Sequence, residues 1–337
     1  MDPFDKHIPS VFVASSPFQV LCSVAVIKQL EIKDFVFYTR LPNGGARNDQ
    51  TINVLKTYKI PYNIIDKIGY LKLLLYILKA IIKRKSKYKR LFICDMRSVI
   101  DYYIGSGYVS DNASVVYLDD GGATLSFLYN ETPIQMKNRD KQILSCISRR
   151  RNLIFQKNLL TIYDAIANNK YNIETLSLNN IFKEEKAPKS NQDIVFVGTN
   201  TDAYCQGLNI PLSIFWEKQS KILRELKQSC KNEKLLFISH GLDVHQSEIL
   251  SMIDEIGCDF LRPQNMIELE MIARGVPPRE IYGFTSTALL TLKSIFPQTH
   301  VVNIMFKQKD GNNIYNSYIA ISNYYKNKGI DLVEIEL

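Results

Sequence analysis

Two adjacent carboxylates are the first groups in this sequence that suit acid–base chemistry. Asp119 and Asp120 follow an apolar run at residues 113–118 and precede two glycines, of which Gly121 is the first. Glycine permits a tight turn and the close approach of a ligand, so a carboxylate here suits a general base acting on a hydroxyl group. The same tripeptide is ordinary turn chemistry, and a metal-binding pair is a third interpretation. The motif alone leaves these interpretations open.

A histidine occupies a similar position in the second half of the chain. His240 follows the apolar run at residues 235–238 and precedes Gly241. A histidine at a strand end suits a general acid near neutral pH, and the alternative is a histidine whose ring bonds the local backbone. Asp243 and His245 follow, but a zinc site needs more ligands at a better spacing.

A third polar motif, at residues 283–288, lies at the start of a predicted helix. It contains Ser286 and Thr287. Hydroxyl groups and free backbone N–H groups at a helix N-terminus form an anion site, which suits a nucleotide phosphate. Simple capping of the helix by serine or threonine is an equally good local interpretation.

The elements that must position these motifs alternate between strands and helices. Apolar runs predict strands at residues 11–14, 34–38, 62–65, 90–94, 113–118, 194–197, 235–238, 260–261, 301–304 and 331–335. Helical patterns separate most of these runs, and residues 130–165 look helical, with interruptions. Continuous apolar strands that alternate with helices are typical of parallel sheets covered on both faces.

A polar segment that contains proline, at residues 183–193, divides the chain into two halves. We therefore predict an N-terminal domain at residues 1–185 and a C-terminal domain at residues 193–337. The predicted fold class is α/β, with two Rossmann-like domains facing across a cleft. Ligands bind such sheets beyond the carboxyl ends of the strands, and the residues of chemical interest fall there: Ser15, Asp95, Asp119, Gly198, His240 and Ser286.

The chain carries a formal charge of +8, and its basic residues cluster at residues 79–90 and 149–151. Such clusters attract anions such as phosphosugars or an anionic membrane surface, although a solvated surface explains them equally well. No zinc-finger or RNA-binding signature accompanies the charge, so a nucleic-acid partner is not expected. A basic amphipathic helix is predicted at residues 69–85.

Six scattered cysteines, without a Cys-x-x-Cys pair, predict free thiols in a reducing compartment. The first residues do not resemble a signal peptide, and the longest apolar stretch is too short to span a bilayer. We expect a cytoplasmic protein, with peripheral contact to an inner membrane as an option.

Taken together and in this order, the motifs resemble those of the bacterial sialyltransferases and polysialyltransferases of the two-domain GT-B type. That family carries an acidic pair before glycine, then His-Pro, then a Ser-Ser or Ser-Thr pair. The matching residues are Asp119-Asp120-Gly121, His240-Gly241 and Ser286-Thr287, the last beginning 46 residues after His240. Ile267-Glu-Leu-Glu270 resembles the family's glutamate segment. Ser15-Ser-Pro-Phe-Gln19 resembles the start of its lipooligosaccharide sialyltransferase branch.

The sequence also departs from the family pattern. Gly241 stands where the family has proline, and Ile238 stands where a lysine is frequent. These differences bear on how the cytosine ring of the donor is recognised.

The resemblance implies an inverting sialyltransferase that moves sialic acid from CMP-sialic acid to a galactose-type acceptor of a bacterial surface glycan. Asp119 would deprotonate the acceptor hydroxyl and His240 would assist the leaving phosphate. Ser286 and Thr287 would hold that phosphate, and Glu270 would contact the donor ribose. No metal and no cofactor are implied, and the acceptor is either free or lipid-linked.

The remaining candidate residues fall into two sets. The donor set adds Gly198 and Gly241, and the set that binds or orients the acceptor comprises Ser16, Gln19, Asp120 and Gly121. Transfer of another sugar (Kdo, another nonulosonic acid or a hexose) is an alternative on the same fold. A nucleotide-sugar epimerase and a non-catalytic assembly protein are further alternatives.

Overall fold

The computed structural model of the 337-residue chain describes part of the sequence. The described residues are 2–41, 45–65, 72, 75, 78, 86–95, 98–130, 158–163, 171–182, 193–230, 233–308 and 311–337. Among them, no helix is long and apolar enough to cross a membrane. Contacts between residues divide the chain into two compact units, Met1–Lys183 and Glu184–Leu337, and each is described by itself.

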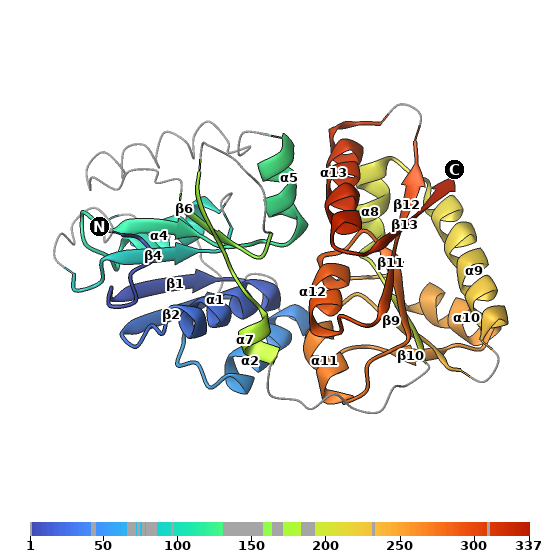
Figure 1. Ribbon diagram of the computed structural model, residues 1–337, viewed down its shortest axis with the longest axis horizontal. Coiled ribbons are helices and arrows are strands. Elements are labelled where there is room, and N and C mark those ends of the chain that lie inside the picture. The colour runs from blue at the N-terminus through green and yellow to red at the C-terminus, as the bar shows by residue number, and fades with distance from the viewer. Residues whose placement is uncertain are drawn as a thin grey trace. The chain divides into compact units, whose positions relative to one another are not determined.

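The first unit is built on a parallel sheet (Figure 1). In the described part of the chain its strand order is β3-β2-β1-β4-β5-β6-β7, and all the strand pairs are parallel. Its elements are β1 (Ser10–Ala14), α1 (Pro17–Gln29), β2 (Phe35–Arg40), α2 (Ala46–Thr57), β3 (Asn63–Ile65), β4 (Arg90–Ile93), α4 (Val99–Ser106), β5 (Ser114–Tyr117), α5 (Gly122–Asn130), β6 (Asn158–Thr161), β7 (Asn172–Thr175) and α7 (Asn179–Phe182).

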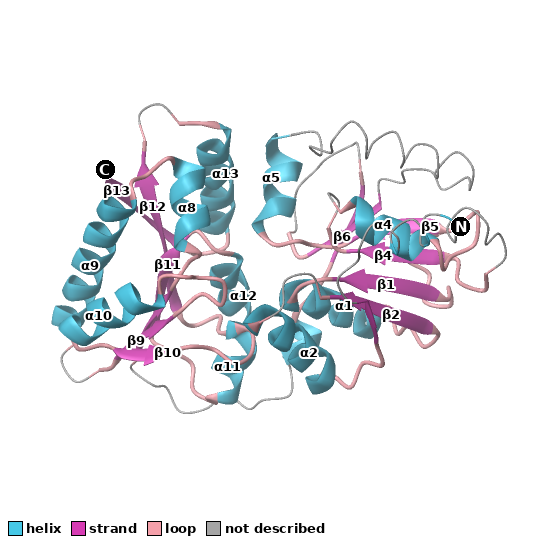
Figure 2. Ribbon diagram, turned by 180° about the vertical axis from the view of Figure 1, so that it is seen from behind, coloured by secondary structure: helices cyan, strands magenta, loops and turns pink. Residues whose placement is uncertain are grey.

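The second unit repeats this plan. Its described strands follow the order β10-β9-β8-β11-β12-β13, again in parallel. Helices α9 and α10 lie on one side of the sheet and α12 and α13 on the other (Figures 1 and 2). The elements are β8 (Ile194–Val197), α8 (Thr201–Leu208), α9 (Leu212–Ser229), β9 (Leu235–Ile238), α10 (Gln246–Ile256), β10 (Asp259–Leu261), α11 (Ile267–Ala273), β11 (Glu280–Phe284), α12 (Thr287–Ile295), β12 (His300–Lys307), α13 (Asn313–Asn327) and β13 (Asp331–Glu336).

Each sheet has a point at which the order of its strands reverses. Strand β1 pairs with both β2 and β4, and β8 pairs with both β9 and β11. In doubly wound sheets the ligand binds outside the carboxyl ends of the strands at such a point. The predicted α/β class, with a parallel sheet in each half, is confirmed.

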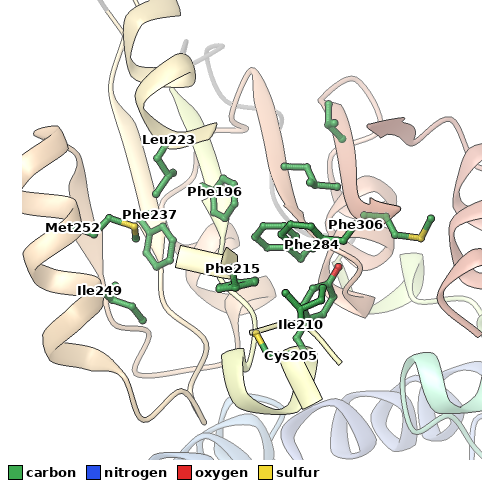
Figure 3. Packing of buried hydrophobic residues seen from close by; sticks show 14 of the residues in the cluster. Phe196, Cys205, Ile210, Phe215, Leu223, Phe237, Ile249, Met252, Phe284 and Phe306 are labelled. Atoms are coloured by element: carbon green, nitrogen blue, oxygen red, sulfur yellow. The ribbon is translucent and has the colours of Figure 1, made fainter. Parts of the chain in front are cut away.

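Aromatic side chains fix the strands of the second sheet against one another (Figure 3). The rings of Phe196 and Phe237 stack at 5.6 Å between centroids, and those of Phe284 and Phe306 stack at 5.5 Å. Phe215 of α9 packs 5.0 Å from Phe284. Truncating one such ring to alanine typically costs about 3–5 kcal/mol, so the carboxyl ends of these strands have a rigid support.

Several described elements differ from the sequence expectation. Residues 130–165 were expected to be helical, but Asn158–Thr161 form β6, and β7 and α8 were not predicted. Only four residues make β6, and its position depends on pairing with β5, where the Asn158 side chain donates to the Val115 carbonyl oxygen at 3.1 Å. A four-residue run carries no periodicity that separates strand from helix.

The last residue of the basic run at 79–90 does not belong to a surface patch. Arg90 is fully buried, and we correct its assignment to a membrane-facing cluster. Its guanidinium donates at 2.9–3.2 Å to Ser10 Oγ and to the carbonyl oxygens of Pro3, Asp5 and Ile8. Arg90 therefore fastens the N-terminal segment to the sheet, because a buried cation must be hydrogen-bonded.

Other sequence expectations are only partly covered by the described residues. Of the predicted helix at 69–85, Lys72, Leu75 and Leu78 are described as helical, and both leucines are exposed, at 57% and 43%. The arginines at 149–151 and Cys146 lie outside the described residues. The other cysteines are free thiols, as predicted: Cys22, Cys94, Cys205, Cys230 and Cys258.

Candidate functional site

A glutamine links two strand ends of the first sheet. Ser16 caps α1, its Oγ accepting from the Gln19 backbone N–H at 3.3 Å, and proline follows as the first helical residue. The Gln19 side chain is buried, and its Oε1 accepts from the backbone N–H and the hydroxyl of Ser15, at 2.7 and 3.1 Å. Its Nε2 donates to Asp120 Oδ1 at 2.8 Å. The end of β1 is therefore connected to the acidic motif after β5.

The two carboxylates of that motif have different surroundings. Asp119 has no exposed surface. Its Oδ1 accepts from Thr161 Oγ1 and its Oδ2 from the Ile162 backbone N–H, both at 2.7 Å. Asp120 is only half-buried. Its backbone N–H donates to Thr124 Oγ1 at 3.0 Å, and Gly121 follows with a φ of 64°, a conformation that favours glycine.

Burial also changes the acidity of Asp119. Loss of solvent raises the pKa of its carboxyl group from 3.8 to about 7, and the hydrogen bonds from Thr161, Ile162 and Thr124 limit that rise. The sequence analysis assigned to Asp119 the role of the base that contacts the acceptor hydroxyl. Its complete burial favours Asp120 for direct contact, since a base must reach the proton that it abstracts.

The carboxyl ends of β2 and β4 add charged groups that the sequence analysis did not single out. Arg40 ends β2, and its Nε and Nη2 donate to Asp101 Oδ1 and Oδ2 at 2.6 and 3.3 Å. Asp101 lies in the first turn of α4 and is almost fully buried. The two residues are 61 positions apart, so no local pattern announces the pair. Asp95, which was singled out, is half-buried just beyond β4.

In the second unit, Gly198 lies where β8 and β9 end. An added Cβ at this position would stand 2.9 Å from the Ile238 carbonyl oxygen and 3.3 Å from the His240 backbone nitrogen. The first distance is shorter than real Cβ contacts permit, so glycine is required for the two strands to approach. The Gly198 N–H completes the approach by donating to the Ile238 oxygen at 2.8 Å.

His240 follows β9 with a defined ring orientation. The ring is half-buried, and its Nδ1 accepts from the Leu242 backbone N–H at 3.2 Å. A neutral imidazole that accepts at Nδ1 carries its proton on Nε2. Nε2 is therefore the nitrogen that can donate to a ligand. Gly241 lies in the same turn and is half-buried.

The Ser-Thr motif forms the beginning of α12. Ser286 is the N-cap, and its Oγ accepts from the Ala288 backbone N–H at 3.3 Å. Tyr325 of α13, buried at 1% exposure, donates its hydroxyl to the Ser286 carbonyl oxygen at 2.9 Å. Thr287 is half-buried at the first helical position. The helix N-terminus favours an anion electrostatically.

The two glutamates of α11 differ in environment. Glu270 is half-buried, and its Oε1 accepts from the Asn265 backbone N–H at 2.7 Å. Glu268 is buried at 3% exposure and accepts a hydrogen bond from Thr291 Oγ1 of α12, and burial raises the pKa of its carboxyl group. Of the two, Glu270 is the residue that a ligand can reach.

Each unit thus gathers a part of the predicted set at its strand-order reversal. In the first unit, the Gln19 side chain is hydrogen-bonded to both Ser15 and Asp120. In the second, Gly198 directly follows β8, which lies between β9 and β11, the strands that lead to His240 and Ser286. Within the described residues, no three His, Cys, Asp or Glu side chains gather closely enough to hold a metal ion.

Comparisons with known proteins identify the fold. No protein-family model matches the chain, and no curated protein matches it in sequence. Among solved structures, the chain is similar to an alpha/beta-galactoside alpha-2,3-sialyltransferase from Photobacterium phosphoreum, with a TM-score of 0.52, 14% identity, and coverage of 97% of this chain and 98% of that one.

Two further structures extend the comparison. A 2,6-sialyltransferase from a Photobacterium species, solved with the donor product CMP and the acceptor lactose, gives a TM-score of 0.53 at 12% identity, over 96% of this chain and 78% of that one. A UDP-N-acetylglucosamine 2-epimerase gives 0.54 at 10% identity, over 94% and 91%. At such identities the likeness shows the fold alone. The chain has the two-domain, Rossmann-like GT-B fold.

Proposed function

We propose that this protein is a metal-independent glycosyltransferase that moves sialic acid from CMP-sialic acid to a galactose-type acceptor of a bacterial surface glycan. One observation carries the proposal. The three motifs that resemble those of sialyltransferases all stand beyond strand ends near a strand-order reversal: Asp119-Asp120-Gly121, His240-Gly241 and Ser286-Thr287. The fold is compatible with other functions, since fold alone does not determine function.

The second unit supplies the donor site in this proposal. The N-terminus of α12, with Ser286 and Thr287, holds the phosphate of the nucleotide. His240 donates to the same phosphate through Nε2, the nitrogen left with the proton when Nδ1 accepts from the backbone. Gly198 lets the ends of β8 and β9 lie close together, and Glu270 contacts the ribose.

The first unit supplies the acceptor site. Asp120 presents the carboxylate that removes the proton from the acceptor hydroxyl. Gln19 orients Asp120 through its 2.8 Å hydrogen bond, and Ser16 fixes the start of the helix that carries Gln19. Asp119 is the buried partner that anchors the motif between β5 and β6.

The chemical step is a single displacement with inversion. The acceptor oxygen forms a bond to the anomeric carbon of the sugar while the bond from that carbon to the phosphate oxygen breaks. The acceptor proton passes to Asp120. The phosphate oxygen keeps the electron pair of the broken bond, and the phosphate accepts a hydrogen bond from His240. General acid and general base catalysis each contribute about 10²–10⁴-fold in rate. No electron transfer is involved.

A nucleotide panel tests the donor class. A ligand present at about 100 times its Kd stabilises the fold by about 2.7 kcal/mol, which raises the melting temperature of a unit of this size by roughly 5–10 °C. We expect this shift with CMP and CMP-sialic acid, and none with UMP or UDP-N-acetylglucosamine. Ser286→Ala should abolish the shift.

A matched variant controls for loss of a helix cap. Asn312 caps α13 as Ser286 caps α12, its side chain accepting from the Tyr315 backbone N–H. Asn312→Ala should lower the melting temperature by a similar amount and keep the full response to CMP. A response to UDP-N-acetylglucosamine, with none to CMP, would replace the proposal with a nucleotide-sugar epimerase or a UDP-sugar transferase.

A further inference from the structure

The loop that carries His240 is tied to a helix far away in the sequence. Thr201, in the first turn of α8, donates its hydroxyl to Asp243 Oδ2 at 2.6 Å, across 42 positions. Its backbone N–H also points to that oxygen, at 3.4 Å. Both residues are buried, Thr201 at 2% and Asp243 at 7% exposure. The loop after β9 therefore has a fixed attachment on α8.

The same aspartate closes the turn that contains His240. The Asp243 backbone N–H donates to the His240 carbonyl oxygen at 3.0 Å, and its Oδ1 accepts from the His245 backbone N–H at 3.0 Å. The Gln246 side chain donates to the Asp243 carbonyl oxygen at 2.8 Å. A single residue thus sets the shape of the turn and joins it to α8.

His245 makes a second attachment to the same turn of α8. Its Nε2 lies 2.9 Å from Asp202 Oδ1, and its ring packs edge-on against Trp216 of α9, with 5.8 Å between centroids. The charged groups around it are Asp202, Asp243 and Glu248, the last at 3.7 Å from Nδ1. The hydrogen bond to Asp202 is the main cause that raises the pKa of His245.

The loop exposes its apolar residues and turns its polar ones inward. Leu242 is 37% exposed and Val244 is 72% exposed, while Asp243 between them is buried. Burying an ionisable group is costly unless hydrogen bonds compensate it. Apolar burial therefore does not explain this arrangement, and the inward polar residues act as tethers for the turn.

We propose that Asp243 and His245 are positioning residues that hold the His240 imidazole in place by fastening its loop to Thr201 and Asp202. The inference rests on the proposed function, since it acts through His240. A displacement of about 1 Å in a group that meets the reacting atoms can cost about 10²-fold in rate. Loosening the loop should therefore lower turnover and leave nucleotide binding nearly intact.

The test is a double-mutant cycle on Thr201 and His240. Thr201→Val keeps the shape of the side chain and removes the hydroxyl that holds Asp243. We expect kcat for sialyl transfer to fall by about 10–10²-fold, with less than about a twofold change in the KM for CMP-sialic acid. Thr201→Ser should restore the rate. In a His240→Ala background, Thr201→Val should have no further effect on kcat.

A stability control distinguishes positioning from general loosening of the unit. Asn303 donates to the Ser322 hydroxyl at 2.8 Å between β12 and α13, and both residues are buried. Ser322→Ala also removes a buried hydrogen bond of the unit, and should lower the melting temperature without lowering kcat. An equal loss of kcat in Ser322→Ala and Thr201→Val would contradict the proposal.

His245→Gln tests the second attachment through the pH profile. A raised pKa means that the ion pair with Asp202 is present at low pH and is lost as the pH rises through the folded-state pKa of His245. The wild-type profile of kcat should contain this ionisation, and the profile of His245→Gln should lack it. Identical profiles would overturn this part of the proposal.

The outcomes also separate this inference from the proposed function. If His240→Ala retains full turnover, the assigned role of His240 fails. If His240→Ala is inactive and Thr201→Val is normal, positioning by the loop fails and the proposed function stands. Additive losses in the double mutant would show that Thr201 acts independently of His240, which contradicts the inference.

Discussion

The pair Asp119 and Asp120 gives the sharpest prediction about catalysis. Substitution by asparagine removes the negative charge and keeps the shape of each side chain. At position 120 the side-chain oxygen can still accept from Gln19, as Oδ1 does at 2.8 Å. Asp120→Asn should therefore fold normally and lose about 10²–10⁴-fold in kcat, the usual contribution of a general base.

Asp119→Asn should behave in the opposite way. A carboxyl group whose pKa rises from 3.8 to about 7 on folding holds its proton in the folded state after the unfolded chain has lost it. The free energy of unfolding of the wild type therefore falls as pH rises between these values, by about 4 kcal/mol at most, and is level above them. Asparagine stays neutral, so this pH dependence of the free energy of unfolding should vanish. The kcat should fall by less than about 10-fold, a smaller loss than removal of a general base causes.

The assays are steady-state transfer kinetics and thermal unfolding between about pH 4 and 8, a range that contains the window from 3.8 to about 7 that the linkage defines. Asp119→Ala is a useful third variant, because it leaves Thr161 Oγ1 and the Ile162 N–H without their partner. It should be destabilised by about 1–3 kcal/mol, the cost of unsatisfied buried groups. Near-normal turnover in Asp120→Asn, with a large loss in Asp119→Asn, would show that Asp120 is not the base and would return that role to Asp119.

Three further predictions concern the leaving group, metal and membrane. His240→Ala should damage transfer from CMP-sialic acid severely and transfer from a nitrophenyl sialoside much less, because a good leaving group needs little help; equal losses with a lower melting temperature would make His240 structural. Activity should persist in excess EDTA, and loss that Mg²⁺ or Mn²⁺ restores would revive a metal-binding role for Asp119 and Asp120. Binding to anionic vesicles should weaken as salt is added, and also when Leu75 and Leu78 are changed to serine, because exposed leucines beside basic residues suit an anionic surface. Absence of binding at low salt would exclude contact with the membrane.

The fold was largely predictable because its strands are continuous apolar runs. Residues 194–197 and 235–238 were read from the sequence with the bounds that the structure has, since strands buried on both faces in a parallel sheet need uniformly apolar residues. Strand β6 was missed because a run of four residues carries no period of its own.

The sequence indicated the candidate residues but not their environments. Strand β5 is buried on both faces, so no alternation of polar residues indicated that Asp119 turns inward and Asp120 remains accessible. The burial of Arg90 was equally invisible, because it depends on carbonyl groups contributed by the N-terminal segment. The link from Thr201 to Asp243 spans 42 positions and has no sequence signature.

The most direct test of the proposed function is a transfer reaction with CMP-sialic acid and lactose, followed by mass spectrometry and NMR. The proposed function predicts sialyl-lactose with the anomeric configuration of the sugar inverted relative to the donor, and release of CMP. It also predicts that Asp120→Asn lowers the rate of product formation by about 10²–10⁴-fold while donor binding persists. Free epimerised sugar, transfer only from a different nucleotide sugar, or a retained configuration would contradict it.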